Sequence, residues 1–405
     1  MKKVLFVINT LGIGGAEKAL LEMLNYLKDR DLSIDLYVLL GRGELMGRIP
    51  AHVRLLNRRV DCGSVLDRDG RRVLAARTAL CFFRHGHWAG KLGSMARSLP
   101  HMLRRKRLQP DKLLWPVVAA GARRPEEPYD AAVAWMEGGS AYFVAGFVRA
   151  RRKIAVIHID YEHSGYSRAM DQDCWARFQR IFVVSEEIKA PFLRVYPECG
   201  EKLRVLPNII DPEAIRRRSA EPGGFDDGWT GLRLLSVGRL TYQKGFDLAV
   251  PALKLLRDAG YPVRWYVLGE GELRAGREKQ IASLGLQEDF LLLGAVENPY
   301  PYYAQADIYV HATRFEGRSI AIQEAQALGR PMVVSDCSGN RLQVADGQDG
   351  LLCALAPEAI ARAVASLLDD PDKRERLGLA AGRRLQPTAE NTGELLELLN
   401  GERAK

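Results

Sequence analysis

Two cations and two glutamates in the second half of the chain have the types and spacing needed to hold a sugar phosphate. Arg239 and Lys244 stand in the glycine-bounded segment 238–245, and Glu316 precedes Glu324 with seven residues between them. A guanidinium and an ammonium group can together neutralise a diphosphate, which would favour a leaving group that gains negative charge. The alternative is that Arg239 and Lys244 are surface charges beside a loop.

A strand is expected before each of these segments. Strands at 232–237 and 308–311 would place the cations and the glutamates at carboxyl ends, where parallel α/β sheets bind ligands. A helix should begin near Ile320, and the N–H groups of its first turn suit a phosphate. Glu316 before this helix and Glu324 inside it could then bind a sugar ring and a ribose. The alternative leaves Glu324 in solvent and makes Glu316 a partner of the helix dipole.

The first half of the chain offers a glycine turn and a histidine, each after an apolar strand. Gly14 and Gly15 follow the strand 3–8 and open a helix, so backbone N–H groups there would face an anion. Glu17 stands where a dinucleotide-binding fingerprint needs its third glycine, so the motif also fits a tight turn made for packing. His158 follows another apolar run, where it would face a ligand or serve as a structural histidine.

These residues need a scaffold, and the chain supplies strands alternating with helices in both halves. This pattern predicts an α/β protein with parallel sheets. The 405 residues fit two domains of about 200 residues each better than one core. We place the domains at 1–212 and 213–385, with a C-terminal helix within 386–405. The expected strands are 3–8, 34–40, 131–135, 154–158, 180–184, 232–237, 264–268, 290–293, 308–311 and 331–335.

Composition limits the class of protein. The hydrophobic fraction of 47% and the charged fraction of 27% are ordinary for a soluble globular protein. No run of about 20 apolar residues could span a membrane, and the N-terminal apolar run breaks at Asn9, as in a buried strand rather than a signal peptide. The six scattered cysteines favour free thiols in a reducing cytoplasm over a zinc site.

Basic residues gather at 68–124, and the whole chain has a net charge of +9. Such a charge fits a phosphorylated substrate, an anionic membrane or nucleic acid. Apolar and aromatic side chains lie among the basic residues of 68–124, a mixture typical of segments that contact anionic lipid head groups. The alternative is a helical insertion with a solvated basic face. Nucleic acid is not expected as a partner, because the sequence has no recognition-helix pattern.

Together these segments resemble the family 4 retaining glycosyltransferases, whose GT-B fold has two Rossmann-like domains facing across a cleft and a C-terminal helix that crosses back to the first domain. The likeness covers nearly the whole chain and is strongest in its second half. Gly14 and Gly15 look like the glycine loop of the family, and the cations of 238–245 look like its diphosphate clamp. The spacing of Glu316 and Glu324 matches its paired-glutamate motif.

The resemblance implies a role for each of these positions. Glu324 should bind the donor ribose and Val296 the nucleobase, while Glu316 and His158 should lie beside the donor sugar and act in catalysis with the two cations. The family often has glycine where Ser319 stands, and this departure leaves the donor sugar open. The residues expected to bind the donor diphosphate are Arg239, Lys244, Gly14, Gly15 and Ile320.

The expected reaction transfers a sugar from a nucleotide diphosphate-sugar, with UDP implied by the resemblance, to a glycan or lipid-linked acceptor. No carboxylate stands out as the nucleophile of a double displacement, and the resemblance implies front-face attack with retained configuration. The Asp-x-Asp pairs of the chain follow no convincing apolar strand, so neither a metal nor another cofactor is expected. The expected setting is cell-envelope polysaccharide synthesis in the cytoplasm, either free or peripheral on the inner face of the plasma membrane.

Two other functions fit the same residues. One is a nucleotide-sugar epimerase of GT-B fold, which would need no acceptor. The other is a non-enzymatic scaffold that binds a nucleotide-sugar at the membrane.

Overall fold

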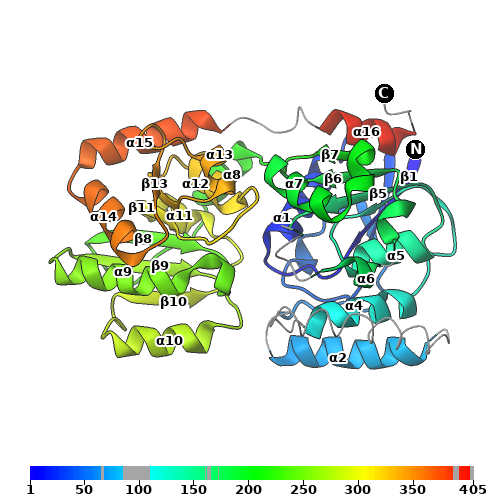
Figure 1. The fold of residues 1–405 in the computed structure, drawn as a ribbon, viewed down its shortest axis with the longest axis horizontal. Helices are drawn as coiled ribbons and strands as arrows, with labels where there is room; N and C mark the ends of the chain where they lie inside the picture. Colours follow the sequence, from blue (N-terminus) through cyan, green and yellow to red (C-terminus); the bar gives the residue numbers. More distant parts are fainter. Residues whose placement is uncertain are drawn as a thin grey trace. The chain divides into compact units, whose positions relative to one another are not determined.

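The computed structural model divides the chain into two compact units (Figure 1). The N-terminal unit holds Met1–Ile209 and Thr388–Lys405, and the C-terminal unit holds Ile210–Pro387. The division falls after Ile209 rather than after 212, because Ile210 is buried in a core of the C-terminal unit. The structure describes residues 1–64, 68–84, 110–159, 161, 166–171, 173–385 and 392–401.

A parallel sheet of seven strands forms the centre of the N-terminal unit, in the order β3-β2-β1-β4-β5-β6-β7. Val4 to Ile8 in the first strand are fully buried, as expected of a parallel strand covered on both faces. The strands are β1 Lys2–Ile8, β2 Leu32–Val38, β3 Val53–Leu55, β4 Tyr129–Ala134, β5 Ala150–Ile157, β6 Arg180–Val183 and β7 Leu203–Val205. The helices are α1 Gly15–Tyr26, η1 Met46–Arg48, α2 Arg68–Phe83, α4 Pro110–Gly121, α5 Gly139–Phe147, α6 Arg168–Asp171, η2 Cys174–Arg177, α7 Glu186–Val195, η3 Pro197–Lys202 and α16 Gly393–Asn400.

The expected basic insertion at 68–124 is in part a piece of the core. Its described ends form α2 and α4, which pack against each other. In α4, Trp115 is 7% exposed and Val117 is fully buried, so this helix is a packed connection between β3 and β4. The part of the expected segment that forms α4 therefore belongs to the core rather than to a solvated face. Residues 85–109, which hold much of the basic charge, lie outside the described residues.

The C-terminal helix α16 belongs to the N-terminal unit, as the sequence predicted. Leu395 and Leu399 of this helix are fully buried, and α16 contacts β1 and β4. Glu394 pairs with Arg180 of β6 at 2.6 Å. Apolar burial and this ion pair both attach α16 to the first sheet.

Six parallel strands form the C-terminal unit, in the order β10-β9-β8-β11-β12-β13. The strands β8 and β11 are neighbours at the centre of this sheet. Strands β9 and β10 lie outward from β8, and strands β12 and β13 lie outward from β11. Doubly wound sheets bind ligands where the strand order reverses in this way, at the carboxyl ends of the two central strands. The strands are β8 Leu232–Val237, β9 Val263–Leu268, β10 Phe290–Gly294, β11 Ile308–His311, β12 Met332–Ser335 and β13 Leu351–Cys353. The helices are α8 Pro212–Ser219, η4 Tyr242–Lys244, α9 Phe246–Asp258, α10 Arg274–Ser283, α11 Tyr300–Gln305, α12 Ile320–Ala327, α13 Ser338–Gln343, α14 Pro357–Leu368 and α15 Pro371–Arg384.

Alternate residues of β11 face two different cores of this unit. Ile308 and Val310 pack in the apolar cluster that holds the buried residues of α9, whereas Tyr309 packs in the cluster that holds Ile322 of α12. The alternation follows from the two-residue period of a strand. Tyr309 and His311 therefore share the face of the sheet that α11 and α12 cover.

No helix in the described part of the chain is long and apolar enough to cross a membrane. All six cysteines are free, as expected, and four of them are buried.

Candidate active site

The loop after β8 places Arg239 and Lys244 at the carboxyl edge of the second sheet. It forms the single turn η4 and enters α9 at Gly245. Gly245 has a φ of 62°, and a Cβ there would lie 1.9 Å from the carbonyl oxygen of Ala312, so glycine is required where this loop meets the end of β11. Arg239 is exposed, and among the described residues its guanidinium has no hydrogen-bond or ion-pair partner.

Glu316, in the loop after β11, has a carboxylate that side chains of β11 and of the loop after β8 contact. Its Oε2 forms an ion pair with the ammonium of Lys244 and lies 3.2 Å from Nε2 of His311. The side chains of Lys244 and Glu316 are only 16% and 14% exposed, so the pair is largely withdrawn from water. The structure thus brings two predicted site residues together and adds His311, which the sequence did not single out.

The surroundings of Glu316 keep its carboxylate ionised. Burial alone would raise its pKa, but Lys244 and His311 outweigh burial and hold the pKa at about 2. Burial lowers the pKa of His311 below its ordinary value, and the charge of Lys244 lowers it further. A neutral His311 beside an ionised carboxylate donates its Nε2–H, which leaves Nδ1 to accept the hydroxyl of Tyr309 at 2.9 Å.

Side-chain hydrogen bonds join the loop after β8 and the first turn of α9 to the loop after β11. Arg314 donates two of them to Asp247, at 2.8 and 2.6 Å, in a bidentate geometry that fixes both partners. Gln243 donates to the carbonyl of Phe315 at 2.9 Å, and Thr313 donates to the carbonyl of Gln243 at 3.0 Å. The two loops are therefore held at a fixed spacing.

Helix α12 begins at Ile320, where the sequence placed a helix start, with Ser319 as its N-cap. Ser319 has a φ of −75°, which any residue can adopt, so serine imposes no strain on this loop. The side-chain amide of Gln343 accepts the N–H of Ser319 at 2.6 Å and donates to its carbonyl at 2.9 Å. The N–H of Ile320 lies in the first turn, whose N–H groups have no intrahelical acceptor and suit an anion.

Glu324, inside α12, is 1% exposed. Its Oε2 accepts the hydroxyl of Tyr303 at 3.0 Å. Burial raises the pKa of Tyr303 well above its ordinary value, and the charge of Glu324 contributes, so this phenol stays a donor. The alternative in which Glu324 is a solvated helix charge is therefore wrong, while its contact with a ribose stays a prediction.

Val296 follows β10 at the same edge of the sheet. It is partly buried against the core that contains Ile322. Because β10, β9, β8 and β11 are consecutive in the sheet, the segments that hold Val296, Arg239 and Glu316 follow one another along one edge. This order suits a ligand with a base at one end and a sugar at the other.

The N-terminal unit places Gly14 and Gly15 where the loop after β1 enters α1. Gly14 is the N-cap of that helix, and Gly15 is its first residue. A Cβ on Gly14 would lie 2.3 Å from Oε2 of Glu17, so the carboxylate of Glu17 folds back over Gly14. On that side, an anion could approach the Gly14 backbone only after Glu17 swings away.

His158 follows β5, and its ring packs against Trp135 with 5.6 Å between ring centroids. Trp135 also donates to the carbonyl of Ala16 at 2.9 Å, so one indole connects the histidine to the glycine loop. Burial lowers the pKa of His158 to about 3, although a hydrogen bond to the backbone of Trp135 acts in the opposite direction. Nε2 of His158 is buried and has no hydrogen-bond partner among the described residues. The ring is therefore neutral at neutral pH.

Two buried polar residues beside His158 were not predicted. Asn9 accepts the N–H of Ser140 at 2.6 Å and donates to the carbonyl of Glu137 at 3.1 Å. The carboxylate of Glu137 accepts the N–H of His158 at 3.2 Å. The carboxyl ends of β1, β4 and β5 thus share one polar network, although no sequence motif marks its members.

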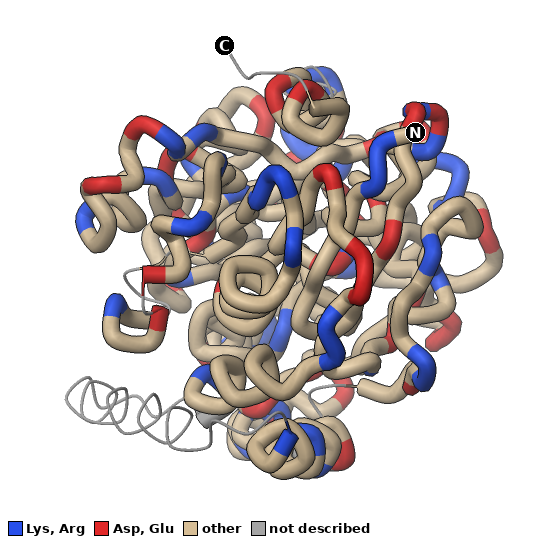
Figure 2. Tube along the Cα trace, turned by 90° about the vertical axis from the view of Figure 1, so that its right-hand side faces the viewer, with Lys and Arg blue, Asp and Glu red and all other residues tan. Residues whose placement is uncertain are grey.

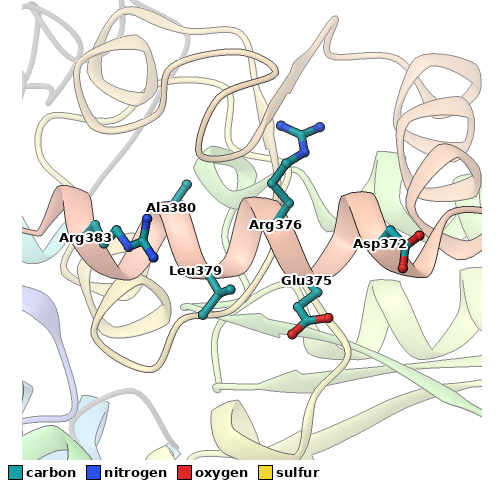
Figure 3. A pocket seen from close by; sticks show the side chains of 6 residues that line it. All are labelled: Asp372, Glu375, Arg376, Leu379, Ala380 and Arg383. Carbon is teal, nitrogen blue, oxygen red and sulfur yellow. The ribbon is translucent and has the colours of Figure 1, made fainter.

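No group of three His, Cys, Asp or Glu side chains in the described ranges could hold a metal ion. A hollow on the surface of the C-terminal unit is lined by α15 alone (Figure 3). Its lining residues are Asp372, Glu375, Arg376, Leu379, Ala380 and Arg383. None of the predicted site residues lines it, and one helix offers no converging set of groups, so we assign it no role.

Residues 230–384 match the protein family described as glycosyl transferases group 1. This range contains both cations, both glutamates and Val296. The C-terminal unit is a group 1 glycosyl transferase domain.

Curated relatives match part of the chain. The amylovoran biosynthesis glycosyltransferase AmsK of Erwinia amylovora is 27% identical over 277 residues, which are 64% of this chain and 65% of AmsK. The N-acetylgalactosamine-N,N'-diacetylbacillosaminyl-diphospho-undecaprenol 4-alpha-N-acetylgalactosaminyltransferase of Campylobacter jejuni is 32% identical over 177 residues, which are 43% of this chain and 47% of that relative. The chain thus matches less than two thirds of the length of either relative.

A solved structure matches nearly the whole chain. Anabaena Alr3699/HepE in complex with UDP-glucose has a TM-score of 0.69 and 16% sequence identity, with 99% of this chain and 100% of that chain covered. At this identity the likeness shows the fold. The group 1 domain and the N-terminal unit therefore make up a GT-B fold of two Rossmann-like domains, as the sequence predicted.

The sequence missed part of what surrounds Glu316 in the group 1 domain. His311 and Gln243 both contact Glu316 or its loop, and neither belongs to a motif. A signal for His311 was present, because it ends a strongly apolar strand, and His158 directly follows one. No comparable signal marks Gln243, since only the meeting of two loops gives it a partner.

Proposed function

We propose that this chain transfers a sugar from a nucleotide diphosphate-sugar, with UDP as the nucleotide, to a glycan or lipid-linked acceptor, with retained configuration and no metal. The grouping of Arg239, Lys244 and Glu316 between the carboxyl ends of β8 and β11 carries the proposal. It supplies one cation that has no partner in the described part of the chain, one cation held by a carboxylate, and the start of α12. These groups match a diphosphate joined to a sugar better than a neutral ligand.

Each residue has a chemical task in this reaction. Arg239 and Lys244 stabilise the negative charge on the departing diphosphate. Glu316 accepts hydrogen bonds from the donor sugar, and Glu324 accepts them from the ribose. The acceptor oxygen bonds to the anomeric carbon on the face that the diphosphate leaves, and a phosphate oxygen takes the acceptor proton. His158, being neutral, contributes a hydrogen bond rather than a charge.

The relatives support the choice of donor and acceptor. The name of AmsK assigns it to amylovoran biosynthesis, and the name of the Campylobacter relative specifies a diphospho-undecaprenol substrate. The Anabaena structure holds UDP-glucose. We therefore extend a UDP-sugar donor and a lipid-linked glycan acceptor to this chain as a proposal.

The proposal is tested first by binding and then by turnover. Thermal unfolding is recorded in EDTA with UDP, GDP and ADP, because a ligand at 100 times its dissociation constant should stabilise the fold by about 2.7 kcal/mol. UDP-sugars that bind are then tested for sugar transfer to lipid-linked glycans. Failure of every nucleotide diphosphate to bind would reject the proposal. An isomerised donor without acceptor would identify an epimerase, and binding without turnover on all acceptors would identify a scaffold.

The proposal places the protein at the cytoplasmic face of an anionic membrane, with α2 in contact with it. Leu80 and Phe83 of α2 are 57% and 81% exposed, and the exposed Arg72 and Arg84 lie on the same helix and just after it. Apolar side chains flanked by arginines suit an anionic lipid surface. Elsewhere on the N-terminal unit, which faces the viewer in Figure 2, basic and acidic positions are interspersed.

A further inference from the structure

A line of buried side chains runs from Glu316 through His311, Tyr309 and Tyr303 to Glu324. The proposed reaction gives roles to the two glutamates but none to the three side chains between them. From the Glu316 end, His311 donates to the carboxylate and accepts the hydroxyl of Tyr309. From the Glu324 end, Tyr303 donates to the carboxylate at 3.0 Å. The rings of Tyr303 and Tyr309 lie 5.3 Å apart, and a side-chain hydrogen bond between the two residues affects the pKa of each, so the two halves of the line meet at these tyrosines.

Burial makes the hydrogen bonds of His311 necessary. His311 is 4% exposed and Tyr309 is fully buried. A buried polar group that lacks a partner costs free energy, so an imidazole at this position destabilises the strand unless both nitrogens are bonded. Tyr309 provides the first bond, which fixes the Nε2–H tautomer, and Glu316 provides the second. The orientation of the ring therefore depends on the residue two positions earlier in β11.

Two negatively charged groups, Glu316 and the diphosphate, compete for the ammonium of Lys244 once a nucleotide-sugar binds. In the structure it pairs with Glu316, whereas the proposed reaction needs its ammonium at the diphosphate. When Lys244 turns toward the diphosphate, Glu316 loses a charged partner. Among the remaining described donors, Gln243 lies 3.5 Å from the other carboxylate oxygen, whereas His311 lies 3.2 Å from the oxygen that Lys244 releases.

We propose that His311, oriented by Tyr309, is a positioning residue that holds the Glu316 carboxylate toward the donor sugar while Lys244 serves the diphosphate. This inference rests on the proposed function. It assigns His311 to the sugar end of the donor, whereas Tyr303, through Glu324, belongs to the ribose end. The two tyrosines of one buried line should therefore affect different parts of the same ligand.

The test compares binding of UDP with binding of the UDP-sugar that the wild-type chain uses. His311→Leu removes the hydrogen bond to an ionised carboxylate and should lower kcat/KM for transfer about 10- to 100-fold, while changing the Kd of UDP less than about threefold. His311→Gln keeps an N–H donor and should restore most of the loss. Tyr309→Phe should have the same effect as His311→Leu but smaller. Tyr303→Phe is the matched control, because it should weaken UDP and UDP-sugar binding equally.

The outcomes separate this inference from the function on which it rests. If the wild-type chain binds no nucleotide diphosphate, the proposed function fails. If the wild-type chain transfers sugar and His311→Leu does so equally well, or weakens UDP as much as the UDP-sugar, the positioning role is wrong and the function stands. If His311→Leu does not fold, Tyr309→Phe decides, because unchanged transfer by that variant contradicts the role of the oriented ring.

Discussion

Lys244 and Glu316 form a largely buried ion pair, and Lys244 is also one of the two cations that the proposed reaction needs at the diphosphate. Lys244→Ala should lower the rate of transfer about 10²- to 10³-fold, by analogy with loss of a transition-state donor. It should also lower the free energy of unfolding by about 3 kcal/mol, because it leaves a buried carboxylate without its counter-charge. Initial rates and urea unfolding measure the two effects. A transfer rate equal to that of the wild type would exclude Lys244 from the clamp.

Arg239 offers a cleaner test of the clamp, because it is exposed and unpaired within the described ranges. Arg239→Ala should reduce transfer about as much as Lys244→Ala, while changing the free energy of unfolding by less than about 0.5 kcal/mol. Arg362→Ala, which removes another exposed arginine from α14, is the control and should change neither quantity. Equal rates for Arg239→Ala and Arg362→Ala would count against the proposed diphosphate contact.

The sequence predicted the scaffold and the loops of the site because both depend on local patterns. Apolar strands followed by glycine turns placed Arg239, Lys244 and Ile320 at carboxyl ends of strands or at a helix start, and the parallel order of the sheets brought them to one edge. The strands β3, β7 and β13 were missed, since three residues are too few to show a period. The strand expected at 34–40 runs from Leu32 to Val38.

The partners of the site residues could not be predicted, because each pair joins distant segments. Asp247 and Arg314 are 67 positions apart, and only the meeting of the start of α9 with the loop after β11 makes them bidentate partners. The burial of Trp115 was also hidden in the sequence, where its basic neighbours indicated an exposed insertion. Trp115 is buried because α4 packs against α5, and the composition of a short segment does not show which helix it will pack against.

Glu316 should stabilise the fold in a pH-dependent way. Its pKa in the folded chain is about 2, below its ordinary value of 4.5, so the unfolded chain binds a proton more readily at intermediate pH. The stabilisation is therefore complete above the ordinary pKa and is lost as the pH falls toward 2, with a size of about 3 kcal/mol. Urea unfolding of the wild type and Glu316→Gln across this range should show a constant difference above about pH 5 that shrinks below it. A difference independent of pH would mean that Glu316 is not held ionised.

His158 should stay neutral well below the pH at which histidine ordinarily titrates. Burial lowers its pKa to about 3 from 6.5, so the folded chain loses stability as the pH falls between these values. In histidine-labelled protein, the signal that disappears in His158→Gln should not move between pH 8 and pH 5 in NMR spectra. A midpoint near the ordinary value would show a solvated ring, and the proposed hydrogen-bonding role without charge would then be wrong.

Membrane contact through α2 depends on two apolar side chains that the fold leaves exposed. Leu80→Asp combined with Phe83→Asp removes apolar surface worth about 1.5–3 kcal/mol per side chain when buried, so binding to vesicles should fall at least about tenfold. Leu379→Asp is the matched control, because Leu379 is 56% exposed but lies on α15. Flotation with phosphatidylglycerol vesicles, repeated with phosphatidylcholine and at high salt, should show binding only to the anionic vesicles and less of it in salt. Equal binding by the double variant and the control would exclude α2 as the contact.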